Sequence, residues 1–245
     1  IVRYSLYSHF NNMSKLISKE DFRDNCGFGL IADINGIKSH KIINKSINAL
    51  RSMTHSRAIG ADGKTGDGCG LLLNLDKDFF KNAISEEQGV KISNEFAIGQ
   101  LFTKNKIESD ISKIEKILKS ENLILKAVRP VPVNKDILGT IASSCLPNIY
   151  QLYIQSTDKV FYEEKFETNL YQARKLIEEI YLDDEQLYFC SLSSKTIIYK
   201  GLMLPDAIQD FYLDLKSSKF ESSICVFHQR FSTNTHPRWH LAQPF

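Results

Sequence analysis

Strand-like segments that follow one another in pairs and in series are the feature that most constrains the fold of this sequence. Short apolar runs, alternating or continuous, are bounded by glycine, proline, asparagine or serine, which is typical of β-strands. We expect strands at residues 26–34, 71–75, 95–102, 123–133, 149–155, 187–194, 195–201 and 222–231. Since no regular strand–helix–strand repeat connects them, the order favours an α+β fold over a doubly wound sheet.

Helical periodicity appears between these strands. Residues 41–53 place Ile43, Ile47, Leu50 and Met53 on one face, and residues 107–119 repeat the pattern with four aliphatic side chains. Residues 76–84 predict a shorter helix. The longest predicted helix covers residues 161–182, and its predicted inward side chains are Phe166, Leu170, Ala173, Ile177 and Ile180. We find no repeat or convincing linker, and therefore expect one domain.

Residues 187–194 and 195–201 predict a β-hairpin, because two strand-like runs follow each other directly. Its turn is expected near Ser193 and Ser194.

Composition excludes several classes of protein. The formal net charge is only +2 over 245 residues, and Lys and Arg are spread along the chain, which does not indicate a nucleic-acid or membrane-surface protein. No apolar run approaches the roughly 20 residues that span a bilayer. The five cysteines are far apart, and the sequence has no CxxC or Cys/His ligand spacing. We therefore expect neither a disulfide framework nor a metal site, and we expect a cytoplasmic protein.

The first residues lack the charged-then-apolar plan of a secretory signal peptide. Met13 is a more natural start than Ile1, so we expect residues 1–12 to be upstream read-through or the edge of a fragment.

Cys26 stands between Asn25 and the Gly27-Phe28-Gly29 stretch, at the head of a predicted strand. Flanking glycines allow a substrate to approach the cysteine closely. A nucleophilic cysteine must also be accessible and easily deprotonated. Taken alone, the pentapeptide equally fits the commoner case of a buried cysteine in a strand.

Residues 60–70 form a glycine-dense loop that contains Asp62 and Asp67. The GxxxxGK[ST] spacing of a phosphate loop fails here, and the EF-hand pattern is absent. We interpret the loop as a structured turn in which several residues have positive φ angles.

The tail from His228 to Thr235 ends a predicted strand with an arginine and a group of hydroxyl and amide side chains. An arginine binds a carboxylate through two parallel hydrogen bonds, as an amino-acid pocket requires. A solvated loop is the alternative. We expect His228 itself to be a structural histidine of the strand.

Together and in this order, the three stretches resemble the class II, N-terminal nucleophile, glutamine amidotransferase domain of the large subunit of bacterial glutamate synthase. RDNCGFGLIADINGIKSH, ADGKTGDGCGLLL, SLSS with IIYKGL, and ICVFHQRFSTNTHPRWHLAQPF carry the resemblance. It implies a four-layer αββα sandwich of the N-terminal nucleophile hydrolase type. Residues 1–25 are then an upstream or propeptide segment, and residues 26–245 are a partial amidotransferase domain.

The resemblance implies that removal of residues 1–25 makes Cys26 the new N-terminus and the catalytic nucleophile. A free α-amino group, with a pKa of about 7.7–8.0, can act as the base for its own thiol. Arg230 then holds the α-carboxylate of L-glutamine, Ser232 and Thr233 line the pocket, and His55 and Arg57 support the site.

Two departures from the family pattern affect this site. The family usually has His-Arg-Gly where this chain has His55-Ser56-Arg57. Either Arg57 reaches the nucleophile from one residue later, or the site is weakened. The family also continues past the Pro-Phe of Phe245 into an Asn-Gly segment that supplies the oxyanion hole, and then an aspartate. We therefore expect the sandwich to be incomplete at its C-terminus.

The implied function is the glutaminase half of a glutamate synthase, in glutamate biosynthesis and ammonia assimilation. A downstream synthase domain would use the ammonia to aminate 2-oxoglutarate, with FMN, an iron–sulfur cluster and electrons from NADPH through a small FAD-containing subunit. No cofactor site is expected within these residues. The alternatives are a catalytically inert fragment and an amide hydrolase of the same fold that does not channel ammonia.

Overall fold

The computed structural model describes residues 26–53, 59–181, 187–232 and 236–245. Within these ranges the strands form two four-stranded sheets in which every neighbouring pair is antiparallel. The first sheet contains, in spatial order, β1 (Gly27–Ala32), β8 (Ile224–Gln229), β2 (Cys69–Asn74) and β7 (Thr196–Gly201). The second contains β4 (Leu123–Pro130), β5 (Asn148–Ser156), β3 (Ala97–Thr103) and β6 (Leu187–Ser193).

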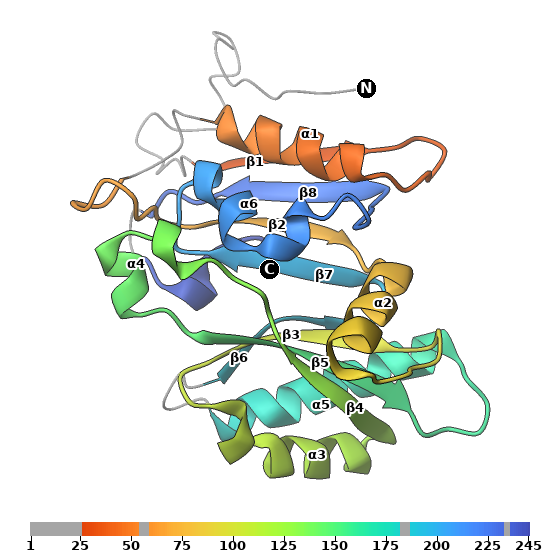
Figure 1. The fold of residues 1–245 in the computed structure, drawn as a ribbon. Coiled ribbons are helices and arrows are strands. Elements are labelled where there is room, and N and C mark those ends of the chain that lie inside the picture. The colour runs from red at the N-terminus through yellow and green to blue at the C-terminus, as the bar shows by residue number, and fades with distance from the viewer. Residues whose placement is uncertain (1–25, 54–58, 182–186, 233–235) are drawn as a thin grey trace, which may run out of the picture.

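Helices cover the outer sides of the two sheets. Figure 1 shows α1 (His40–Arg51) beside β1 and β8 at one end of the molecule, and α3 (Ile111–Ser120) and α5 (Glu163–Ile180) beyond the second sheet at the other end. Three further helices lie at the flanks of the sheets: α2 (Lys77–Gln88), α4 (Thr140–Ser144) and α6 (Ile208–Phe211). The predicted α+β class and its helix–sheet–sheet–helix layers are confirmed.

The apolar faces predicted for the helices are the ones that the fold buries. Ile43, Ile47 and Leu50 of α1 are fully buried in a core that also contains the apolar side chains of β2 and β8. A second core lies between α3, α5 and the second sheet. The sequence pattern of these helices is therefore a consequence of one-sided packing.

Ile180 is a correction, because its side chain is 54% exposed rather than inward. It is the last residue of α5, and the next residue, Tyr181, takes the inward position instead. The Tyr181 hydroxyl donates a hydrogen bond of 2.8 Å to Asp110, just before α3. Burial raises the pKa of this tyrosine far above its usual value, so the phenol stays neutral.

The predicted hairpin at residues 187–201 is wrong. β6 belongs to the second sheet and β7 to the first, so the chain passes from one sheet to the other at Ser194 and Lys195. The backbone N–H of Ser194 and the hydroxyl of Ser193 both donate to Glu167 of α5, which holds the crossing point against that helix. Both strands are buried on both faces, so their mostly apolar sequences resemble those of two neighbouring strands of a hairpin.

The short helix α4 was not predicted, because five residues are too few to show a period. The glycine-dense loop caps its N-terminus. The carboxylate of Asp62 accepts from the N–H of Ile141 at 2.9 Å, and the hydroxyl of Thr65 accepts from the N–H of Ala142 at 3.1 Å. The cap comes from residues nearly 80 positions away, so local sequence could not reveal it.

Candidate active site

The pairing of β1 with β8 brings the first and third of the singled-out stretches together. Gly27 lies opposite Gln229, so Cys26 at the head of β1 meets the residues that follow β8. Cys69 of β2 lies opposite the same Gln229, from the other side of β8. The end of the glycine-dense loop thus arrives at the same corner of the first sheet.

Cys26 lies against the backbone of Phe231. The Phe231 N–H donates to the Cys26 Sγ over 3.5 Å, and the Cys26 thiol can donate to the Phe231 carbonyl over 3.9 Å. One residue therefore offers a donor to a thiolate and an acceptor to a thiol. Cys26 is also partly exposed, so a ligand can approach the sulfur.

Three other cysteines are in surroundings that suppress reactivity. Cys69, Cys190 and Cys225 are buried, and burial raises the pKa of Cys190 and of Cys225 to about 12. Cys145 is exposed at the end of α4, where its thiol lies 3.4 Å from the carbonyl of Ile141. Cys26 is thus the partly exposed cysteine that lies at the meeting point of the three stretches.

The glycine-dense loop holds the residues after β8 in place. Its Gly63 and Gly68 have φ angles of +69° and +123°, so two residues of the loop take the positive φ that was expected of several. The Gly68 carbonyl accepts from the N–H of Arg230 at 2.8 Å, and the Asp67 carboxylate accepts from the N–H of Ser232 at 2.5 Å. Asp67 is only 8% exposed.

The predicted carboxylate-binding residue, Arg230, is 7% exposed and lies directly after β8. The side-chain amide of Gln229 donates to the Arg230 carbonyl at 3.0 Å, which fixes the backbone there. The hydroxyl of Ser232 is buried without a hydrogen-bond partner among the described residues.

Several predicted site residues lie outside the described ranges. These are Thr233, His55 and Arg57, together with Ser56 of the departure from the family pattern. His228 is buried in β8, opposite Phe28, which agrees with the structural role expected for it. Sequence reasoning missed Asp67: it weighed this residue only as a calcium ligand, although an aspartate between two glycines directly before a buried strand was a usable signal.

The last described segment packs alongside the same end of the first sheet. Trp239 is buried, and its indole N–H donates to the carbonyl of Ala142 at 3.1 Å. The Lys200 ammonium donates to the His240 carbonyl at 3.0 Å and the Tyr188 hydroxyl at 3.1 Å, and the Tyr188 and Phe245 rings lie 4.6 and 4.5 Å from it. Burial lowers the pKa of Lys200 to about 8.

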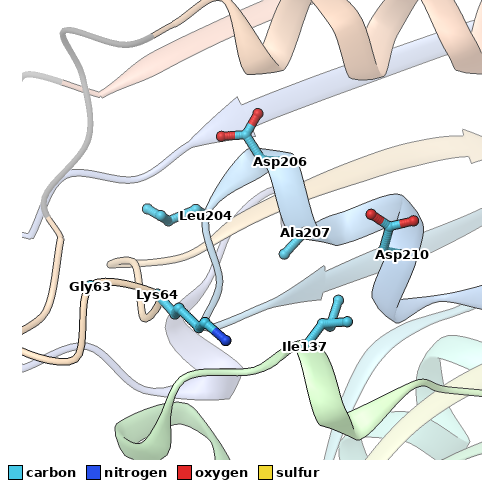
Figure 2. Close-up of a pocket in the computed structure, with 7 residues that line it drawn as sticks. All are labelled: Gly63, Lys64, Ile137, Leu204, Asp206, Ala207 and Asp210. Carbon is cyan, nitrogen blue, oxygen red and sulfur yellow. The ribbon is translucent and has the colours of Figure 1, made fainter.

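A pocket beside the glycine-dense loop is lined by none of the residues that meet at this corner. Figure 2 shows Lys64 of the loop on one side of it, and Asp206 and Asp210 of the short helices on the other. Each aspartate already has a cationic partner, Arg51 for Asp206 at 4.0 Å and Lys216 for Asp210 at 2.8 Å. Cys26 is not among the residues that line it. The site corner, rather than this pocket, therefore contains the reactive group.

Two antiparallel sheets stacked between layers of helices have the arrangement of the N-terminal nucleophile hydrolase fold. The family described as "Glutamine amidotransferases class-II" matches residues 26–245 of this sequence. The chain belongs to that family.

Relatives with assigned names agree with the family match. The chain is 38% identical over 233 residues to a glutamate synthase [NADPH] large chain of Azospirillum brasilense, with 92% of this chain and 15% of the relative covered. It is 37% identical over 247 residues to a ferredoxin-dependent glutamate synthase of Pyropia yezoensis, with 98% and 16% covered. A glutamate synthase [NADPH] large chain of Bacillus subtilis is 35% identical over 243 residues, with 96% and 16% covered.

The chain therefore spans about one-sixth of the length of these relatives. Among the described residues, no helix is both long and apolar enough to cross a membrane, and no cluster of three His, Cys, Asp or Glu side chains could hold a metal ion.

Proposed function

We propose that residues 26–245 are the glutamine-hydrolysing part of a glutamate synthase, with Cys26 as the nucleophile. The observation that carries the proposal is the convergence at Cys26: the sulfur lies against Phe231, between Arg230 and Ser232, in a chain of the class II amidotransferase family. The named relatives that share this region are glutamate synthases.

The proposed chemistry begins with removal of residues 1–25, which converts the backbone nitrogen of Cys26 into a free amine. The amine accepts the thiol proton, and the sulfur attacks the side-chain amide carbon of glutamine. The C–N bond breaks, the proton passes to the leaving nitrogen, and ammonia departs from a γ-glutamyl thioester. Water then hydrolyses the thioester to release glutamate and regenerate the thiol.

Arg230 is proposed to bind the α-carboxylate of glutamine, and Ser232 and Thr233 to line the pocket. The burial of Arg230 supports the first assignment, and the Ser232 hydroxyl, which is buried without a hydrogen-bond partner within the described ranges, supports the assignment of Ser232. His55 and Arg57 are proposed to support the site from the segment before the glycine-dense loop.

In the whole protein, we propose that the ammonia passes to a downstream synthase domain and aminates 2-oxoglutarate. FMN and an iron–sulfur cluster there would receive electrons from NADPH through a small FAD-containing subunit. Relatives named for NADPH and relatives named for ferredoxin match this chain about equally, at 38% and 37% identity. The electron donor is therefore tested by which of the two supports glutamate formation.

The test of the glutaminase role uses the full-length protein with Cys26→Ser. We expect glutamine-dependent glutamate formation to fall by at least about a thousandfold, while formation from added ammonia stays within about twofold, since only the nucleophile is lost. Cys145→Ser, at an exposed cysteine at the end of α4, is the matched control and should change neither. Glutamine use that survives Cys26→Ser would refute the assignment.

A further inference from the structure

Three consecutive backbone N–H groups after β8 are all fixed by residues from elsewhere in the chain. The N–H of Arg230 donates to the Gly68 carbonyl at 2.8 Å, and the N–H of Ser232 donates to the Asp67 carboxylate at 2.5 Å. Between them, the N–H of Phe231 points at the Cys26 Sγ over 3.5 Å. Two adjacent residues of the glycine-dense loop thus hold the peptide groups on either side of the one that contacts the sulfur.

The hydrogen bond from the Ser232 N–H to Asp67 is a charge-assisted one. The Asp67 carboxylate is 8% exposed, and a short hydrogen bond from a neutral donor to a charged acceptor is worth more than one between neutral groups. The neighbouring Gly68 has a φ of +123°, and a Cβ built there would lie 2.8 Å from the Cβ of Ala242. The loop therefore has little freedom to move away from residues 230–232.

A hydrogen bond donated to a sulfur stabilises the thiolate more than the thiol. The direction of the Phe231 N–H consequently affects the charge state of Cys26. That N–H belongs to a stretch without secondary structure after β8, so its direction depends on the bonds at Arg230 and Ser232.

We infer that Asp67 is the positioning residue of the nucleophile: by holding Ser232 it keeps the Phe231 N–H directed at the Cys26 sulfur, and this N–H stabilises the thiolate. The inference rests on the proposed role of Cys26. Asp67 touches neither substrate nor sulfur in this account and acts through the Phe231 peptide group.

The negative charge of Asp67 and the hydrogen bond that it accepts shift the thiol pKa of Cys26 in opposite directions. A carboxylate near a thiolate disfavours the thiolate by repulsion, so loss of the charge alone lowers the thiol pKa. Loss of the positioning hydrogen bond raises it. Asp67→Asn removes the charge but retains an acceptor oxygen, whereas Asp67→Ala removes both. The two substitutions therefore separate the two roles.

The experiment measures the rate of Cys26 alkylation by iodoacetamide against pH in the full-length protein, by mass spectrometry of the peptide that contains Cys26. We expect Asp67→Ala to raise the apparent thiol pKa by about one unit, because a hydrogen bond to a charged group is lost. We expect Asp67→Asn to leave it unchanged or lower it. Asp62→Asn, a carboxylate of the same loop that caps α4, is the control and should not shift it.

Kinetics give a second readout. Asp67→Ala should lower kcat with glutamine about tenfold, and Asp67→Asn should recover it to within about threefold of the unchanged protein. Formation of glutamate from added ammonia should stay constant, because it belongs to the proposed downstream domain. Unchanged hydrogen exchange of the slowest amides of β5 in both variants shows that residues 26–245 remain folded. A thiol pKa that falls in both variants, or equal losses of kcat in both, would overturn the positioning role. The alkylation curves need no glutamine, so they remain decisive even if Cys26→Ser shows the proposed function to be wrong.

Discussion

Arg129 is the most heavily bonded charged side chain of the described core, and its replacement tests how the two sheets are held together. The guanidinium, at the end of β4, is 2% exposed. It donates to Asp214 at 2.9 Å from both terminal nitrogens, to Gln151 of β5 at 2.8 Å, and to Glu87 of α2 at 2.7–3.0 Å. Tyr199 of β7 also donates to Asp214, at 2.8 Å. The network therefore connects both sheets and α2.

The size of the expected loss in stability follows from how exposed each acidic partner of Arg129 is. The Glu87 side chain is 43% exposed, so its share is about 1 kcal/mol or less. The Asp214 side chain is 2% exposed, and Arg129→Met leaves that carboxylate buried without its cation. Removal of one partner of a buried ion pair typically costs about 3–5 kcal/mol, so we expect a total loss of about 4 kcal/mol in the free energy of unfolding.

The assay is hydrogen exchange followed by mass spectrometry in the full-length protein, with the slowest amides of β5 reporting the unfolding of this domain. The double variant Arg129→Met with Asp214→Asn should lose clearly less than Arg129→Met alone, because no buried charge remains. A loss in the double variant that equals or exceeds the loss in Arg129→Met alone would refute the reasoning.

Two further predictions concern stability and pH. Hydrogen bonds from the Thr65 hydroxyl and from backbone N–H groups hold the pKa of Asp62 well below its usual range. Its stabilisation is therefore present above a pH of about 3.9 and lost below it. Asp62→Asn should lower the Tm at neutral pH, and the difference should disappear on acidification in calorimetry; a constant difference would contradict this. Burial lowers the pKa of Lys200 to about 8, from about 10.4 in the unfolded chain. Between these two pKa values the unfolded state binds more protons than the folded state. The destabilisation caused by burying the charged Lys200 is therefore complete below about pH 8 and decreases as the pH rises. Relative to Lys200→Met, the unchanged protein should gain about 3 kcal/mol between about pH 7 and about pH 10 in denaturant titrations, and no relative gain would refute the shift.

Much of this fold could be predicted from local sequence, for reasons that the structure makes plain. α1 and α5 pack one face on a core and leave the other in water, so their side chains show the period of a helix. β6 and β7 were wrongly predicted to pair as a hairpin, because the sequence of a strand that is buried on both faces carries no information about which sheet it joins. The choice between a hairpin and a crossing of the sheets depends on contacts such as Glu167 with Ser194, which are remote in sequence.

The candidate site, too, could be predicted from the sequence only in part. Cys26 and Arg230 could be proposed from the sequence because their residue types suit the proposed chemistry and the surrounding motifs resemble a family. Asp67 was missed because its partner, the N–H of Ser232, is 165 positions away and is a backbone group that any residue could supply. The contact between Cys26 and Phe231, 205 positions apart, was invisible for the same reason. Side-chain chemistry can be read from a sequence, whereas backbone groups that complete a site appear only in the fold.

The central claim, that a free N-terminal Cys26 is the nucleophile, can be tested by trapping the intermediate. Full-length protein would be acid-quenched during turnover with isotope-labelled glutamine, digested, and analysed by tandem mass spectrometry. The account predicts a labelled γ-glutamyl group on the sulfur of Cys26, in a peptide that begins at Cys26. A label on another residue, or on a Cys26 still joined to Asn25, would contradict it.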